Sequence, residues 1–293
     1  MNEIRFVKKG DSMEEKHEKE NENENKEIIA EKKTNFWTAK HKKGIFEYRV
    51  VDLVVLAVMF ALFAAYFLAP KAYSVTTARY NAGTQEQNEE VVLALGTERT
   101  EEDFRTYFQW YNVIHEMGHG MIRYNSHKKF GNAEEEQLVN DFAVAYWMMY
   151  GEADKLERME YITSHAMNSL QSDAEPGQTY MEFAKARWGK RGFFTFRNYG
   201  WFQFSSSNES LKNKKDMATV LREMGIDSFD LPENPEIISY GMMSEEVSDQ
   251  ILIDAVENIN SWGVYFPKVY HKYHNNPNDN YSKPVKDLGF VAF

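Results

Sequence analysis

The sequence contains no cysteine among its 293 residues. This absence excludes a disulfide scaffold, a thiolate zinc site, an iron–sulfur cluster and a cysteine nucleophile. The chain also has no glycine-rich phosphate loop, no G-x-S-x-G elbow and no internal repeat. Positive charge is scarce, because 34 Lys and Arg stand against 45 Asp and Glu and leave a net charge of −11. Nucleic-acid binding requires a basic surface for phosphate contacts, so we expect no nucleic-acid partner.

The remaining composition is that of a folded protein with unlike regions. Hydrophobic residues make up 43% of the chain and charged residues 27%, which permits one sizeable domain with a packed core. Residues 1–49 carry 12 Lys and Arg against 11 Asp and Glu, whereas residues 70–293 carry 22 against 33. The acidity therefore belongs to the C-terminal part of the chain.

A long apolar run separates these two regions. Leu53–Ala69 is 17 residues without a charge, and as a helix it would span roughly 26 Å, near the lower limit for a bilayer core. No face of the run is polar, which favours a transmembrane helix over a buried core helix. Lys and Arg are more numerous before the run than after it, so the positive-inside rule predicts a cytoplasmic N-terminus. We expect residues 50–70 to be a single-pass signal anchor in the cell membrane, with the C-terminal domain extracytoplasmic. The reverse orientation would make that domain cytoplasmic.

The other boundaries follow from composition. Residues 1–49 are rich in Glu, Asn and Lys and predict a disordered, charged cytoplasmic tail. After the anchor we expect a linker over residues 71–90, one folded domain over residues 91–268 and a solvated C-terminal tail over residues 269–293. Val91–Leu95, a short apolar run between Glu and Gly, favours a strand or the edge of a small sheet. The fold class expected is mainly α, or α+β at most.

A helix that begins near Thr100 leads to the motif His115-Glu116-Met117-Gly118-His119. In this H-E-x-x-H arrangement the two histidines are one helical turn apart and point the same way. Two neutral imidazoles so placed can bind one Zn²⁺, and Glu116 can act as general base on a water at the metal. The alternative is an ordinary amphipathic helix with two surface histidines.

A hydrolytic zinc site needs a third protein ligand. A second helix is predicted from about Ala133, and Glu134, Glu135 and Glu136 at its start are all candidates, with Asp141 behind them. The helical periodicity does not choose between the glutamates.

Glu136-Gln-Leu-Val-Asn140-Asp-Phe-Ala143 resembles the E-x-x-A-[DN]-x-F-A helix that follows H-E-x-G-H in ImmA/IrrE-like metallopeptidases. It also resembles the E-x-x-x-D helix of thermolysin-like gluzincins, and the resemblance covers residues 112–150. It implies a zincin-like helical metallopeptidase domain in which Glu136 is the third zinc ligand and Asn140 hydrogen bonds a ligand histidine. The sequence departs from these patterns at Val139, where alanine is usual, and at Asn140, where gluzincins have Asp.

Further along the chain, apolar residues recur at helical spacing in four segments: 153–170, 179–188, 216–224 and 244–262. His165, on the first of these, is a candidate to stabilise the oxyanion of a tetrahedral intermediate, although a structural role is the simpler interpretation. The aromatic stretch 192–204 is interpreted as core rather than as a wall of a substrate groove.

Together these features predict a membrane-anchored zinc metallopeptidase that acts on a peptide or protein substrate. Two alternatives remain open: a membrane-tethered helical binding or scaffold protein with an inactive metal site, and a non-peptidase metal hydrolase built on the same pair of helices.

Overall fold

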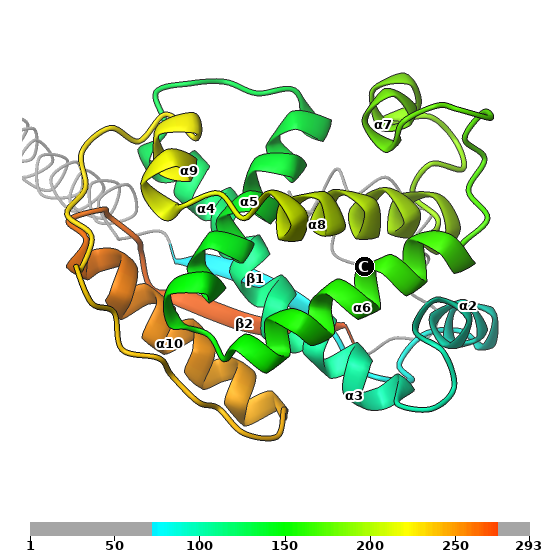
Figure 1. The fold of residues 1–293 in the computed structure, drawn as a ribbon, viewed down its shortest axis with the longest axis horizontal. Helices are drawn as coiled ribbons and strands as arrows, with labels where there is room; N and C mark the ends of the chain where they lie inside the picture. The colour runs from blue at the N-terminus through cyan, green and yellow to red at the C-terminus, as the bar shows by residue number, and fades with distance from the viewer. Residues whose placement is uncertain (1–71, 275–293) are drawn as a thin grey trace, which may run out of the picture. The chain divides into compact units, whose positions relative to one another are not determined.

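The computed structural model of the chain describes residues 72–274, which fold mainly as helices (Figure 1). The mainly α class expected from the sequence is confirmed for this region. The elements are β1 (Tyr73–Ala78), α2 (Gln85–Leu95), α3 (Thr100–Arg105), η1 (Thr106–Tyr111), α4 (Asn112–Asn125), α5 (Asn132–Tyr150), α6 (Ala153–Ser169), α7 (Tyr180–Arg187), η2 (Phe196–Gly200), α8 (Trp201–Asn213), α9 (Met217–Glu223), α10 (Glu245–Ser261) and β2 (Val269–His274).

None of the helices within residues 72–274 combines the length and hydrophobicity that crossing a membrane requires. The predicted anchor at residues 50–70 and the predicted tail at residues 1–49 lie outside the described residues.

The sheet joins the two ends of the described region. β1 and β2 pair in parallel, with Tyr73 opposite Val269 and Ala78 opposite His274. Two boundary predictions are therefore wrong: the linker at residues 71–90 contains a strand and most of a helix, and the tail at residues 269–293 begins with a strand. The polar side chains of β2 suggested a solvated tail. One of its histidines, His271, is instead held in the fold. His271 lies between Thr77, at 2.8 Å, and Asp249, at 2.6 Å.

The predicted strand at Val91–Leu95 is also wrong, because these residues are the last turns of α2. Thr84 caps this helix through a capping box with Gln87, which starts the helix well before the apolar run. The buried positions are Val91, Ala94 and Leu95, and Leu93 is 55% exposed. This spacing of three and four is helical, and the β-branched pair at the start of the run gave the misleading strand signal.

The helix predicted to start near Thr100 is present and continues without a break into α4. Its middle, η1, is a π-helical turn in which every residue is buried. A π turn accommodates an extra residue and shifts the helical phase, and such turns are frequent at functional sites. The four helices predicted after residue 152 are confirmed as α6, α7, α9 and α10, each within about one residue at either end.

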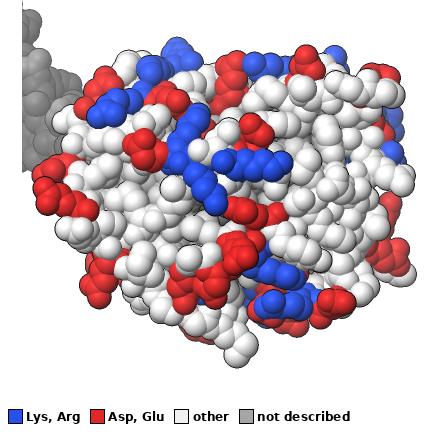
Figure 2. Space-filling model, viewed as in Figure 1, with Lys and Arg blue, Asp and Glu red and all other residues white. Residues whose placement is uncertain are grey.

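The aromatic stretch 192–204 is core, as expected, but it also starts a helix that the sequence did not predict. η2 and α8 run from Phe196 to Asn213 and pack against α5 and α6. Charged side chains of both signs are interspersed among uncharged areas on the face of the molecule in Figure 2. The charged groups described next lie inside the fold instead.

Candidate metal centre

The site is formed where α4 crosses α5, and a glycine permits the close approach. A Cβ atom on Gly118 would lie 2.8 Å from the Cβ of Val139 and 3.2 Å from its Cα. Carbon atoms do not approach so closely without displacement, so a side chain at this position would separate the two helices. The glycine inside the H-E-x-x-H motif thus accommodates the valine at position 139.

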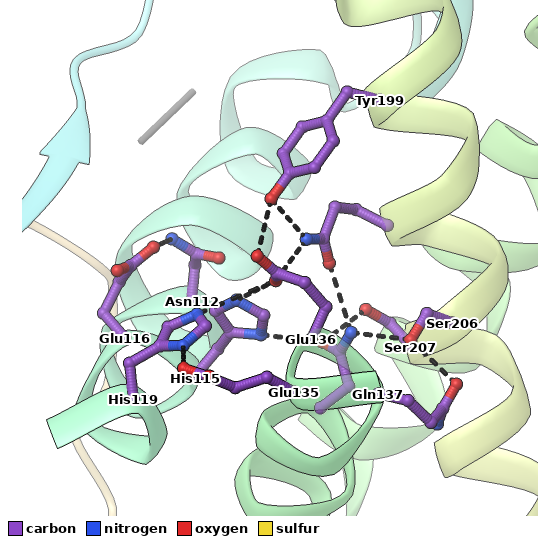
Figure 3. A network of polar contacts seen from close by, with 12 residues as sticks. Asn112, His115, Glu116, His119, Glu135, Glu136, Gln137, Tyr199, Ser206 and Ser207 are labelled. Atoms are coloured by element: carbon purple, nitrogen blue, oxygen red, sulfur yellow. Dashed lines mark hydrogen bonds and ion pairs between the residues drawn. The ribbon is translucent and has the colours of Figure 1, made fainter. Parts of the chain in front are cut away.

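Three side chains converge at this crossing, as Figure 3 shows: His115 and His119 from α4 and Glu136 from α5. Their possible ligand atoms all lie within 4.8 Å of one another. The Oε2 atom of Glu136 is 3.3 Å from Nε2 of His115 and 3.7 Å from Nε2 of His119. All three residues are buried, with between 4% and 9% of their surface exposed. This group could hold a metal ion.

The two histidine–carboxylate distances are longer than direct hydrogen bonds and are close to the spacing of ligand atoms around one ion. An N–H···O bond is about 2.7–3.2 Å long, and both Nε2–Oε2 distances are longer. Tetrahedral zinc with bonds of about 2.0–2.2 Å separates its ligand atoms by about 3.3–3.6 Å, close to the separations seen.

The Nδ1 atoms of both imidazoles, which lie on the side away from Glu136 Oε2, each contact a hydrogen-bond acceptor. Nδ1 of His115 is 2.9 Å from Oδ1 of Asn140, and Nδ1 of His119 is 2.8 Å from Oε1 of Glu135. Asn140 also donates through Nδ2 to Gln203 and Ser206, which fixes Oδ1 as the acceptor. An acceptor at Nδ1 selects the tautomer with its proton there and leaves the Nε2 lone pair for a metal.

The carboxylate of Glu116 belongs to the same buried cluster. Its Oε1 accepts from Asn112 at 3.4 Å, one helical turn earlier, and its backbone oxygen accepts from the Tyr73 hydroxyl at 2.8 Å. Burial raises the pKa of Glu116, and the charges of His115 and His119 act against that shift. A carboxylate with a raised pKa is suited to accept a proton near neutral pH.

The charge of the cluster favours a cation. Burial opposes ionisation of Glu136, but the neighbouring His119 and His115 outweigh it and hold the pKa of Glu136 below its usual value. Burial likewise opposes protonation of His119, and Glu136 and Glu135 outweigh it, so the pKa of His119 is raised. Three carboxylates, those of Glu116, Glu135 and Glu136, thus lie around the two imidazoles.

The structure separates the four acidic candidates for the third ligand. Glu136 alone joins the two histidines. Glu135 holds Nδ1 of His119 instead, and Glu134 pairs with Lys185 at 2.7 Å on the surface. Asp141 accepts from Ser210 at 2.6 Å and from Lys215 at 3.0 Å, away from the imidazoles.

His165 is not brought to this cluster. It lies on α6, where Ser169 contacts its Nε2 at 3.3 Å and the ring of Tyr161 stacks on it. A Cβ atom on Gly96, at the end of α2, would also meet Nε2 of His165, which places the imidazole between α6 and α2. These contacts are those of the structural role that was the simpler interpretation of His165 from the sequence.

Sequence reasoning missed the residues that η2 and α8 contribute. The Tyr199 hydroxyl donates to Oε1 of Glu136 at 2.9 Å, and Gln203 donates through Nε2 to Oε2 at 2.6 Å. The only signal for these two residues in the local sequence was their spacing of four. That spacing indicates a shared helix face but does not identify Glu136 as the group they contact.

No family model matches the chain, and comparisons with curated proteins and with solved structures found no match either.

Proposed function

We propose that the protein is a zinc-dependent metallopeptidase of the gluzincin type. The observation that supports the proposal is the convergence of two Nε2 atoms and one carboxylate oxygen, with each Nδ1 atom held by an acceptor. A set of two imidazoles and one carboxylate is one that zinc takes in hydrolytic sites, where three protein ligands are usual.

The roles follow from position and chemistry. His115, His119 and Glu136 hold the ion, which when bound supplies a Lewis acid for the scissile carbonyl and lowers the pKa of a water. Glu116 removes a proton from the attacking water at its carboxylate and then delivers it to the nitrogen of the leaving amine. Asn140 and Glu135 keep the protons of both imidazoles on Nδ1 throughout.

The decisive experiment measures zinc content and peptide hydrolysis together in the full-length chain. Glu116→Gln should retain about one zinc per chain and lose hydrolysis of an unfolded protein by about 10²–10⁴-fold, because only the base is removed. His119→Ala should lose both zinc and activity. The matched control is His127→Ala, because His127 lies beyond the same helix with 59% of its side chain exposed.

The outcomes separate the alternatives. Absence of stoichiometric zinc from the wild-type chain would refute the proposal. Zinc without chelator-sensitive cleavage would favour the tethered binding protein, and cleavage of small esters or amides but not of peptides would favour a different hydrolase.

The proposed location of this activity is the outer face of the cell membrane, anchored by residues 50–70. Its support is the sequence pattern alone: the apolar run and the excess of Lys and Arg before it. Protease added to intact cells should digest the domain, whereas a protected domain would reverse the orientation.

A further inference from the structure

Two polar side chains, one from η2 and one from α8, contact the carboxylate of Glu136. Tyr199 and Gln203, one turn apart, occupy different oxygens of the Glu136 carboxylate: the hydroxyl contacts Oε1 and the amide contacts Oε2. Gln203 also donates to the Tyr199 hydroxyl at 2.8 Å. All three residues are buried. The carboxylate is thus fixed against rotation, with Oε2 turned toward the two imidazoles.

The same glutamine connects Glu136 to the support of His115. Its Oε1 accepts from Nδ2 of Asn140 at 3.1 Å, and Oδ1 of that asparagine is the acceptor for His115. Gln203 therefore lies in one hydrogen-bonded chain that runs from the candidate carboxylate ligand to a candidate imidazole ligand. One amide group sets the position of two candidate ligands from different helices.

We propose that Gln203 and Tyr199 are positioning residues that make Glu136 offer a single oxygen, Oε2, to the metal. The inference rests on the proposed metal site and goes beyond it. A carboxylate can bind a metal through one oxygen or both, and the choice changes the number of positions left for water and substrate. Both oxygens accept a hydrogen bond, but Oε2 is the one that lies 3.3 and 3.7 Å from the two Nε2 atoms, and the Tyr199 hydroxyl holds Oε1 in its own hydrogen bond. The carboxylate would therefore present one oxygen to an ion held with the two histidines.

The test replaces each donor and measures the metal directly. Gln203→Met keeps the length of the side chain and removes the amide, and Tyr199→Phe removes only the hydroxyl. We expect the zinc affinity of the full-length chain to fall by about 10–100-fold for Gln203→Met, the usual effect of losing a group that supports a ligand. Tyr199→Phe should give a smaller loss, because Gln203 still contacts Oε2.

The visible absorption spectrum of Co²⁺ bound in place of zinc reports the number of ligands. It should not change if Tyr199 and Gln203 only stabilise the fold. Four-coordinate Co²⁺ absorbs more strongly in the visible range than five-coordinate Co²⁺. Saturated with Co²⁺, the wild-type chain should show the strong four-coordinate bands, and Tyr199→Phe should weaken them because the freed Oε1 can join the metal. A loss of affinity with an unchanged spectrum would leave these residues as general supports of the fold and overturn the proposal.

Ser205→Ala is the matched control on the same helix. Ser205 is buried, and its hydroxyl has no hydrogen-bond partner among residues 72–274, so its removal should leave both zinc affinity and the cobalt spectrum unchanged. If the wild-type chain binds neither metal, the proposed function fails. If it binds both and the two variants behave as wild type, only the present inference fails.

Discussion

Gly118→Ala should separate α4 from α5 and weaken the metal centre. The added Cβ would start 2.8 Å from the Cβ of Val139, so the helices must move by about 0.7–1.2 Å to reach ordinary van der Waals contact. Overpacking of this kind costs about 1–3 kcal/mol, and the gain in helix propensity offsets about 1 kcal/mol of it. We therefore expect a net loss of stability of about 0–2 kcal/mol.

Gly200→Ala is the matched control. Gly200 has helical backbone angles, φ −59° and ψ −47°, and a Cβ there would meet its nearest neighbour, Leu170, at 3.5 Å. This variant should gain up to about 1 kcal/mol from helix propensity. The free energies of unfolding of the two alanine variants should thus differ by about 1–3 kcal/mol, although the chemical change is the same.

Urea titration followed by tryptophan fluorescence measures that difference, because five of the six tryptophans lie within residues 72–274. Zinc affinity is the sharper assay. Metal–ligand distances tolerate changes of only about 0.2 Å, so the displaced helices should bind zinc at least tenfold more weakly.

The variant Gly118→Ala/Val139→Gly, which moves the glycine to the facing helix, should recover most of the affinity. Equal stability and equal zinc affinity in the two single alanine variants would refute the close-approach argument.

Three further predictions concern residues around the site and at the sheet. Glu135→Gln should lower zinc affinity by about 10–100-fold, measured by competition with a chelator, because the acceptor at Nδ1 of His119 loses its charge; unchanged affinity would contradict this role. Asp141→Asn should keep one zinc per chain by elemental analysis while destabilising the fold by about 1–2 kcal/mol through its contact with Lys215; loss of zinc would instead make Asp141 a ligand. Burial lowers the pKa of His271, although Asp249 acts to raise it, so the folded state binds a proton less readily than the unfolded chain. Stability should therefore be highest above pH about 6.5 and fall as the pH decreases through and below that value, and His271→Asn should reduce this dependence in urea titrations at pH 7.5 and 5.5.

The two candidate histidine ligands were predictable because their relation is local. His115 and His119 share a face through a spacing of four, and the same spacing places Asn140 one turn beyond Glu136. Helical periodicity could not decide between Glu135 and Glu136, because both of these adjacent residues contact histidines of α4. Only the packing of the two helices decides which carboxylate meets the Nε2 atoms and which meets Nδ1 of His119.

The elements that sequence reasoning missed depend on distant partners. Tyr199 and Gln203 lie more than 60 positions after Glu136, and nothing near them in the sequence identifies a carboxylate as their acceptor. β1 shows the alternation of a strand, with Tyr73, Val75 and Thr77 buried, but its partner lies at the other end of the domain. A short strand without a neighbouring hairpin gives a weak signal.

The pairing of β1 with β2 has a consequence for biosynthesis. Thr77 and His271 contact each other across 194 positions, so at about 5–20 residues per second the ribosome produces the second strand about 10–40 s after the first. The ring of Tyr73 packs beneath α4 against Phe266, which is also translated late. The nascent chain therefore carries the complete H-E-x-x-H helix without these surroundings until Phe266 and β2 have been synthesised. Maturation of this helix therefore depends on synthesis of the segment that holds Phe266 and β2, and not only on the reading of its own codons.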